Sequence, residues 1–192
     1  MIQTPCVIFA GGKSSRMKED KSLLPFASYP TLTQYQYTRL SKIFSTVYIS
    51  CKDTTKYDFQ ANFIEEHSPV FAPTVGFVTL FEQLKASKVF VLSVDTPFIT
   101  EKEIKKIFDA DKKNYDATIA KTQDKIQPLC GIYHRSMFEI FQKMLQEENH
   151  KLSKILNQTT TCFVPFENTQ PFMNLNYPQE YKEALKLSNA ML

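Results

Sequence analysis

The stretch Pro5-Cys6-Val7-Ile8-Phe9-Ala10-Gly11-Gly12 decides the fold, because an apolar run typical of a buried strand ends in two adjacent glycines. The 192-residue chain contains only four glycines, at positions 11, 12, 76 and 131, whereas average usage is roughly 7%. Adjacent glycines at the end of a buried strand let the backbone approach a ligand closely and direct its amides at it. We therefore expect a binding site directly after the first strand.

A basic loop follows the glycine pair. Lys13, Arg16, Lys18 and Lys21 lie within nine residues, which indicates an anionic ligand. Arginine can hold a phosphate with two parallel hydrogen bonds, and lysine acts as a mobile point charge. The loop therefore predicts a nucleotide carrying phosphates, with a merely solvated basic turn as the simpler alternative.

Two better-known phosphate motifs do not fit this loop. Gly12-Lys13-Ser14 resembles the end of a Walker A loop, but Val7 stands where that motif needs its first glycine. A GxGxxG pattern is absent because no glycine lies between positions 12 and 76.

Strand-like and helical patterns alternate along the chain. Strands are expected near 5–10, 46–51, 61–64, 88–94, 115–120, 127–133 and 160–165, and helices near 31–44, 74–86, 100–109, 135–148, 151–157 and 178–189. Thr100 and Glu103 have the spacing of a capping box. Such alternation predicts a Rossmann-like α/β domain of three layers, a mostly parallel sheet with helices on both faces.

Asp95 lies at a comparable place on another predicted strand. It follows Val89-Phe90-Val91-Leu92-Ser93-Val94, so the carboxyl ends of this strand and of the first one should share an edge of the sheet, where such folds bind ligands. A carboxylate there can hold Mg²⁺ between itself and phosphate oxygens. The alternative is an aspartate that caps the turn before the next helix.

The composition argues against several classes of protein. A net charge of +3 is too small to indicate nucleic-acid binding, and no apolar stretch approaches the 18 residues that a membrane span needs. We expect one domain over residues 1–192, without a signal peptide. The four cysteines are widely spaced and the three histidines form no ligand motif, which favours a cytoplasmic protein with free thiols.

The segment Phe9-Ala10-Gly11-Gly12-x-Ser14-x-Arg16-Met17-x-x-Asp20-Lys21 closely resembles the signature loop of nucleotidyltransferases with the MobA-like fold. Within that superfamily the chain is most similar to the molybdenum cofactor guanylyltransferases. Three further segments resemble theirs: Asp95-Thr96-Pro97-Phe98, Gln127-Pro128-Leu129-Cys130-Gly131-Ile132-Tyr133 and Asn174-Leu175-Asn176-Tyr177-Pro178-Gln179-Glu180. The resemblance covers nearly the whole chain.

This resemblance implies that GTP and molybdenum-loaded molybdopterin react to give the guanine dinucleotide cofactor and pyrophosphate. About 1–120 would bind the nucleotide and about 121–192 the pterin substrate. Lys21, Arg16 and Asp95 would be catalytic, and Asp95 would also bind the cofactor Mg²⁺. The residues implied in nucleotide binding are Phe9, Ala10, Gly11, Gly12, Lys21, Ser50, Glu66 and Asp95; those on the pterin side are Asn174 and Asn176.

The chain departs from the family pattern at four positions that bear on nucleotide selectivity. Lys18 and Ala72 stand where the family usually has glycine, Glu66 where it has aspartate, and Ser50 where it often has asparagine. Glu65-Glu66 could instead form a solvated acidic pair. Asn174 and Asn176 could instead serve turn chemistry before the last helix.

Two other functions remain open at this point. One is a related transferase that uses CTP on a pterin or a nucleotide on a sugar phosphate. The other is a non-catalytic carrier of GTP or cofactor. The pathway implied by the resemblance adds cofactor-delivery and molybdoenzyme-maturation proteins as expected partners.

Overall fold

A seven-stranded sheet forms the centre of the computed structural model, which describes residues 1–12, 16–17, 19–123 and 125–189. The strands are β1 (Cys6–Phe9), β2 (Val47–Cys51), β3 (Asn62–Glu65), β4 (Lys88–Ser93), β5 (Ala117–Thr122), β6 (Lys125–His134) and β7 (Thr161–Phe166). Their order is β3-β2-β1-β4-β6-β5-β7. Only β6 runs antiparallel to its neighbours β4 and β5 within the described sheet, so the prediction of a mostly parallel sheet is confirmed.

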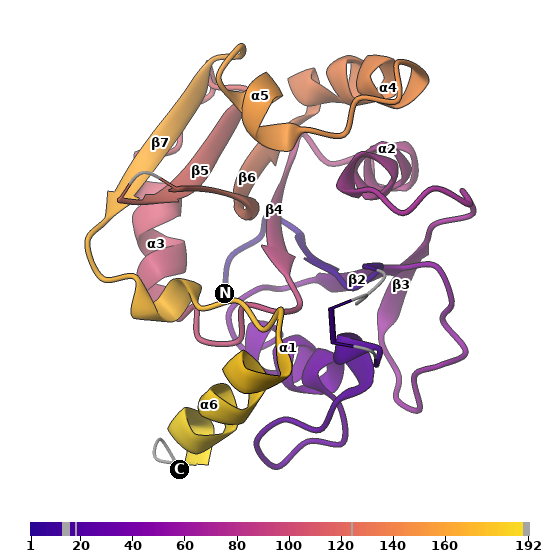
Figure 1. Cartoon of the computed structure of the whole chain (residues 1–192). Helices are drawn as coiled ribbons and strands as arrows, with labels where there is room; N and C mark the ends of the chain where they lie inside the picture. Colours follow the sequence, from indigo (N-terminus) through magenta and orange to yellow (C-terminus); the bar gives the residue numbers. More distant parts are fainter. Residues whose placement is uncertain (13–15, 18, 124, 190–192) are drawn as a thin grey trace.

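Helices cover both faces of this sheet (Figure 1). One face carries α1 (Leu32–Leu40), α3 (Glu101–Ala110) and α6 (Pro178–Asn189), and the other carries α2 (Pro73–Gln83), α4 (Phe138–Gln146) and α5 (Leu152–Leu156). The division follows from the alternation of strand side chains: Cys6 and Ile8 of β1 enter the first cluster, and Val7 and Phe9 enter the second. The molecule therefore has the three predicted layers.

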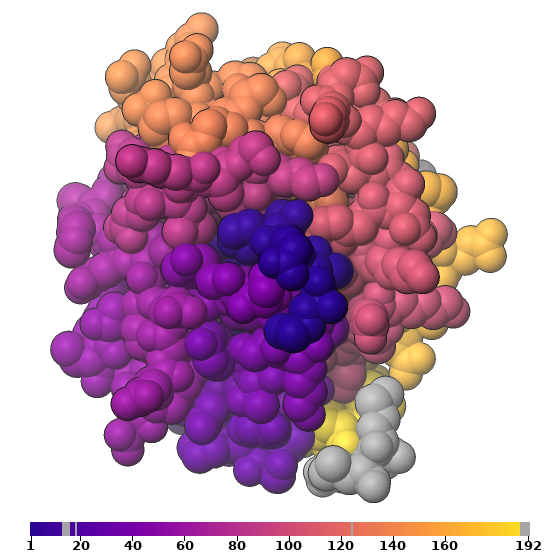
Figure 2. Space-filling view, turned by 180° about the vertical axis from the view of Figure 1, so that it is seen from behind, coloured from indigo at the N-terminus to yellow at the C-terminus, as the bar shows by residue number. Residues whose placement is uncertain are grey.

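The residues that lead into β1 lie on the back of the molecule (Figure 2). Figure 2 shows the first residues of the chain, in indigo, at the centre of that face. No helix of the described part of the chain is both long and apolar enough to cross a membrane.

Helix ends differ from expectation where side chains or backbone compete with the helix. The helix expected at 31–44 is capped by the Thr31 side chain but ends at Leu40, after which 41–44 form a turn. The segment expected at 135–148 begins as a 3₁₀ turn, Arg135–Met137, before α4. The capping box of Thr100 and Glu103 on α3 is confirmed.

Gly76 and Gly131 lie where two elements pack too closely to leave room for a side chain. A Cβ atom at Gly131 of β6 would lie 2.4 Å from the carbonyl oxygen of Thr118 in β5, and one at Gly76 of α2 would lie 2.5 Å from a ring carbon of Phe9. A Cβ atom at Gly12 would meet nothing within 4 Å among the described atoms. Gly76 and Gly131 therefore serve packing, whereas Gly12 borders open space.

Gly131→Ala is expected to lower the free energy of unfolding by about 1–3 kcal/mol, because overpacking moves backbone in the sheet. Gly12→Ala is the matched control, and its free energy of unfolding should stay within about 1 kcal/mol of the wild-type value. Urea unfolding of both variants measures the difference. Equal destabilisation by the two substitutions would contradict this assignment.

Candidate active site

The carboxyl ends of neighbouring strands form the site. Phe9 of β1 is in register with Ser50 of β2 on one side and with Ser93 of β4 on the other. The residues that follow these strands, Gly11-Gly12 and Asp95, therefore leave the same edge of the sheet. This confirms the predicted placement.

A cavity opens at this edge. The predicted residues that line it are Phe9, Ala10, Gly11, Gly12, Lys21, Glu66 and Asp95. Residues that the sequence did not single out for the site also line it, among them Asp20, Phe71, Pro73, Ser93 and Leu129. The glycine pair, the lysine and the aspartate thus surround one space although they come from separate segments.

Lys21 and Asp95 form an ion pair inside this cavity. The Lys21 ammonium bonds to Oδ2 of Asp95 and donates to Oδ1 of Asn176 at 3.1 Å. The hydroxyl of Ser93 donates to Oδ1 of Asp95 at 2.6 Å. Asp95 is buried, so its charge is held by specific partners rather than by bulk water.

A short 3₁₀ helix, η1 (Lys21–Leu23), positions the lysine. The Asp20 carboxylate accepts hydrogen bonds from the backbone amide of Ser22 at 3.0 Å and from Lys56 at 2.7 Å. Burial acts to raise the pKa of Asp20, but the hydrogen bonds from Lys56 and Ser22 outweigh it and the pKa is lowered. The hydroxyl of Thr33 in α1 donates to the Ser22 carbonyl at 2.7 Å, which ties η1 to a helix.

Glu66 presents a buried carboxylate to the same cavity. Burial raises the pKa of Glu66, an effect that the hydrogen bond from Ser50 and the charge of Lys52 partly oppose. Ser50 is fully buried, and its hydroxyl donates to Oε1 of Glu66 at 2.7 Å. Ser50 therefore holds the Glu66 carboxylate by a buried hydrogen bond. Because Glu66 is itself buried, it is not part of a solvated acidic pair.

Glycine at position 11 leaves room for this carboxylate. A Cβ atom there would lie 3.2 Å from Oε1 of Glu66, tighter than most such contacts. The glycine pair thus has two different tasks: Gly11 admits Glu66, and Gly12 borders the cavity.

Glu66→Gln is expected to raise the melting temperature at pH 7. The pKa of Glu66 in the folded state is raised above its ordinary value of 4.5. The wild-type chain therefore loses stability as the pH rises from 4.5 to the folded-state pKa, because ionisation favours the unfolded state. The amide removes this loss, so the gain should disappear below about pH 4.5. Thermal unfolding from pH 4 to pH 8 checks this, with the half-buried neighbour Glu65→Gln as control. A gain independent of pH would contradict it.

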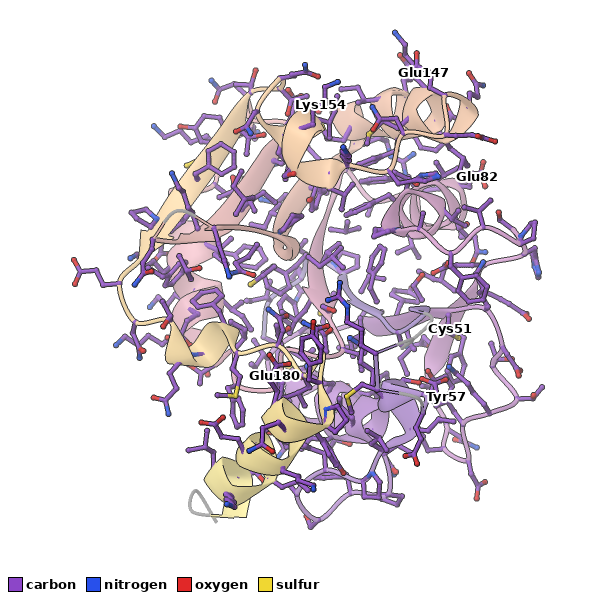
Figure 3. The ribbon with its side chains drawn as sticks, viewed as in Figure 1. Cys51, Tyr57, Glu82, Glu147, Lys154 and Glu180 are labelled. Atoms are coloured by element: carbon purple, nitrogen blue, oxygen red, sulfur yellow. The ribbon has the colours of Figure 1, made fainter. Side chains whose placement is uncertain are left out.

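The segment before α6 reaches the same site from the other end of the chain. The backbone amide of Leu175 donates to the carbonyl oxygen of Asp95 at 2.9 Å. Glu180 accepts hydrogen bonds from the amides of Asn176 at 2.7 Å and Tyr177 at 2.9 Å, and lies at the end of α6 nearest the middle of the molecule (Figure 3). Asn174 donates to the Phe172 carbonyl at 3.3 Å, a local turn contact.

A second hollow adjoins the first. It shares Asp95, Ser93, Pro73 and Leu129 with the cavity described above and is also lined by residues from the second half of the chain, Gln127, Asn174 and Asn176. These three residues also line a third hollow, which extends to Thr122, Lys125 and Glu180. The hollows therefore form one groove with Asp95 at the junction of its first two parts.

Arg16 contacts the ring of Tyr177. Its exposed guanidinium is 5.6 Å from the ring centroid of Tyr177, within cation–π range, and Arg16 is not among the described residues that line the cavity. Lys13 and Lys18 lie outside the described residues.

A metal ion bound at this site would need ligands from substrate or water in addition to those from the described residues. The described residues contain no group of three or more His, Cys, Asp or Glu side chains that could hold one. Mg²⁺ is commonly bound through one or two carboxylates together with substrate phosphates and water. The buried carboxylate of Asp95, at the junction of two hollows, fits that mode.

Comparison with known proteins agrees with this geometry. Residues 6–162 match the model of the MobA-like NTP transferase domain. A molybdenum cofactor guanylyltransferase of Campylobacter jejuni subsp. doylei is 39% identical over 180 residues, 93% of each chain. One of Helicobacter pylori strain 26695 is 33% identical over 189 residues, 95% of this chain and 92% of that one. The chain belongs to the molybdenum cofactor guanylyltransferases.

Solved structures show the same fold at lower sequence identity. The molybdopterin-guanine dinucleotide biosynthesis protein A of Archaeoglobus fulgidus superposes with a TM-score of 0.81 at 18% identity. The superposition covers 98% of this chain and 100% of that one. A 2-C-methyl-D-erythritol 4-phosphate cytidylyltransferase of Thermus thermophilus superposes with a TM-score of 0.71 at 14% identity, covering 98% and 100%. The predictions of an α/β nucleotidyltransferase fold and of an enzyme of this family are confirmed.

Proposed function

We propose that this chain transfers GMP from GTP to the terminal phosphate of molybdenum-loaded molybdopterin, giving the guanine dinucleotide cofactor and pyrophosphate. The observation that carries the proposal is the groove whose first two parts meet at Asp95, beside Lys21 and Asn176. Two anionic substrates would meet there. The names and family of the relatives support the choice of nucleotide and acceptor.

GTP would occupy the first cavity, which is built almost entirely from residues before position 120. Its phosphates would lie near Gly12, Lys21 and Asp95, and Glu66 would face another part of the nucleotide. The pterin substrate would occupy the second hollow, where Asn174 and Asn176 join Gln127. The chain thus acts as one domain over 1–192, with its two functional parts divided near residue 120.

The reaction needs no general base. The attacking phosphate oxygen is already anionic at neutral pH, because a phosphomonoester has its second pKa at about 6. It forms a bond to the α-phosphorus of GTP while the bond to pyrophosphate breaks. The task of the protein is to hold two mutually repelling anions in line and to offset their charge.

Lys21 would exchange partners during this cycle. Its ammonium pairs with Asp95 and Asn176 in the structure, and its flexible four-carbon stem lets it turn towards nucleotide phosphates. Asp95, relieved of that partner, would hold Mg²⁺, which neutralises charge on the phosphates when bound. Arg16, which lies beside the ring of Tyr177, would add positive charge for the phosphates.

We also propose that the reaction takes place in the cytoplasm and that delivery and maturation proteins receive the product. All four cysteines are free thiols, and three of them are buried, in keeping with a reducing compartment.

The direct test is incubation with Mg²⁺, molybdopterin and each nucleoside triphosphate in turn, followed by mass analysis. We expect the guanine dinucleotide and pyrophosphate from GTP. A product from CTP or with a sugar phosphate would instead assign the chain to a related transferase. Nucleotide binding with no pyrophosphate would make it a carrier.

A further inference from the structure

Gln36 of α1 contacts the backbone on both sides of Asp95. Its side chain is fully buried, and Nε2 donates to the carbonyl oxygens of Val94 and Thr96, each at 3.1 Å. The Ser93 carbonyl lies within reach of the same nitrogen, at 3.4 Å. One side chain, 59 positions before Asp95 in the sequence, thus binds the carbonyls of both residues next to Asp95.

Arg39 fixes the orientation of this amide. Its Nε donates to Oε1 of Gln36 at 2.6 Å, and its Nη1 donates to the Ile99 carbonyl. Since a guanidinium can only donate, the oxygen of Gln36 must face Arg39 and the nitrogen must face the carbonyls. Burial lowers the pKa of Arg39 to about 10, which leaves it protonated at neutral pH.

The carbonyl of Asp95 itself is held by a different segment of the chain. It accepts the backbone amide of Leu175, while those of Val94 and Thr96 are held by Gln36. A buried carbonyl that loses its hydrogen-bond partner destabilises the folded chain. The backbone that carries the Asp95 carboxylate is therefore held from both α1 and the C-terminal segment.

We propose that Gln36 is a positioning residue, which holds residues 93–96 so that the Asp95 carboxylate points to a divalent cation bound with the nucleotide. The inference rests on the proposed function. On this proposal, the Lys21 side chain changes partner when substrate binds, whereas Asp95 stays in place. Groups that orient a metal ligand typically contribute about 10- to 100-fold to metal affinity.

Gln36→Glu separates positioning from folding. The carboxylate has nearly the same shape, still accepts from Arg39 and supplies a negative partner for that buried cation. This gain offsets part of the stability lost with the two donated hydrogen bonds, so the variant should remain folded with at most a modest fall in melting temperature. It cannot donate to the carbonyls of Val94 and Thr96 and would repel them. We expect the dissociation constant of Mn²⁺, measured by electron paramagnetic resonance with saturating GTP, to rise about 10- to 100-fold.

Two further variants make the test specific. Gln36→Leu removes the donors without adding charge and should weaken Mn²⁺ binding in the same way. Gln34→Leu, at a half-buried position two residues earlier on α1, is the matched control and should bind Mn²⁺ like the wild type. GTP affinity without metal should change little in all three, because Gln36 acts through Asp95.

Three results would overturn the inference. The first is wild-type Mn²⁺ affinity in folded Gln36→Glu, and the second is an equal loss of Mn²⁺ affinity in Gln36→Leu and Gln34→Leu. The third is failure of both Gln36 variants to fold, which would make Gln36 a core residue only. A wild-type chain that binds neither GTP nor Mn²⁺ with GTP would instead refute the proposed function on which the inference rests.

Discussion

Lys21→Ala is expected to lower kcat for pyrophosphate release by about 10²–10³-fold, the usual effect of removing one preorganised group that stabilises developing charge. The ammonium lies in the cavity between Asp95 and Asn176, where both substrates would meet. Because Lys21 also masks the Asp95 carboxylate, the same variant should bind Mn²⁺ more tightly than the wild type when no nucleotide is present. Steady-state kinetics and metal titration measure the two effects.

Two controls accompany this variant. Lys102→Ala removes an exposed lysine of α3 and should keep wild-type turnover. A melting temperature near that of the wild type would show that Lys21→Ala is folded. Near-normal pyrophosphate release by folded Lys21→Ala would remove this residue from the mechanism.

Asp95→Asn is expected to reduce turnover by a comparable factor, about 10²–10³-fold. The amide keeps the size of the side chain and its contact with Ser93 but removes the negative charge that would hold Mg²⁺ and that pairs with Lys21. Excess Mn²⁺ should not restore activity, whereas GTP should still bind without metal. Isothermal titration with GTP, with and without metal, separates these expectations.

Asp109→Asn serves as the matched control, because Asp109 is an exposed carboxylate on α3. It should leave activity unchanged. If Asp95→Asn responded to Mg²⁺ as the wild type does, the metal would have to be held elsewhere and the assignment of Asp95 would be wrong.

Local patterns in the sequence were sufficient for much of the fold. Apolar, β-branched runs predicted all seven strands to within a few residues, since a strand's side-chain alternation is a property of neighbouring residues. Helix ends were less well predicted. The turn after Leu40 and the 3₁₀ start of α4 depend on hydrogen bonds to carbonyls that the helical pattern does not reveal.

Several residues of the site could not be found from sequence. Nothing about Gln36 distinguishes it from Gln34, since its role comes only from the carbonyls that α1 meets after packing on the sheet. The sequence did single out Ser50, as a nucleotide-binding residue, but it did not reveal that Ser50 is fully buried and donates to Glu66. Asp20 had a weak local signal, a side chain that can accept from the amide two residues later.

The sequence by itself determined where strands end, that glycines and cations follow β1, and that a carboxylate follows β4. Parallel strands then bring these segments to one edge, because their carboxyl ends share it. Only the tertiary structure decided that Asn176 would contact Lys21 across 155 positions, that β6 would run antiparallel, and which glycines serve packing. Those features depend on how distant surfaces pack, and the energy of such contacts is not encoded in any short stretch of chain.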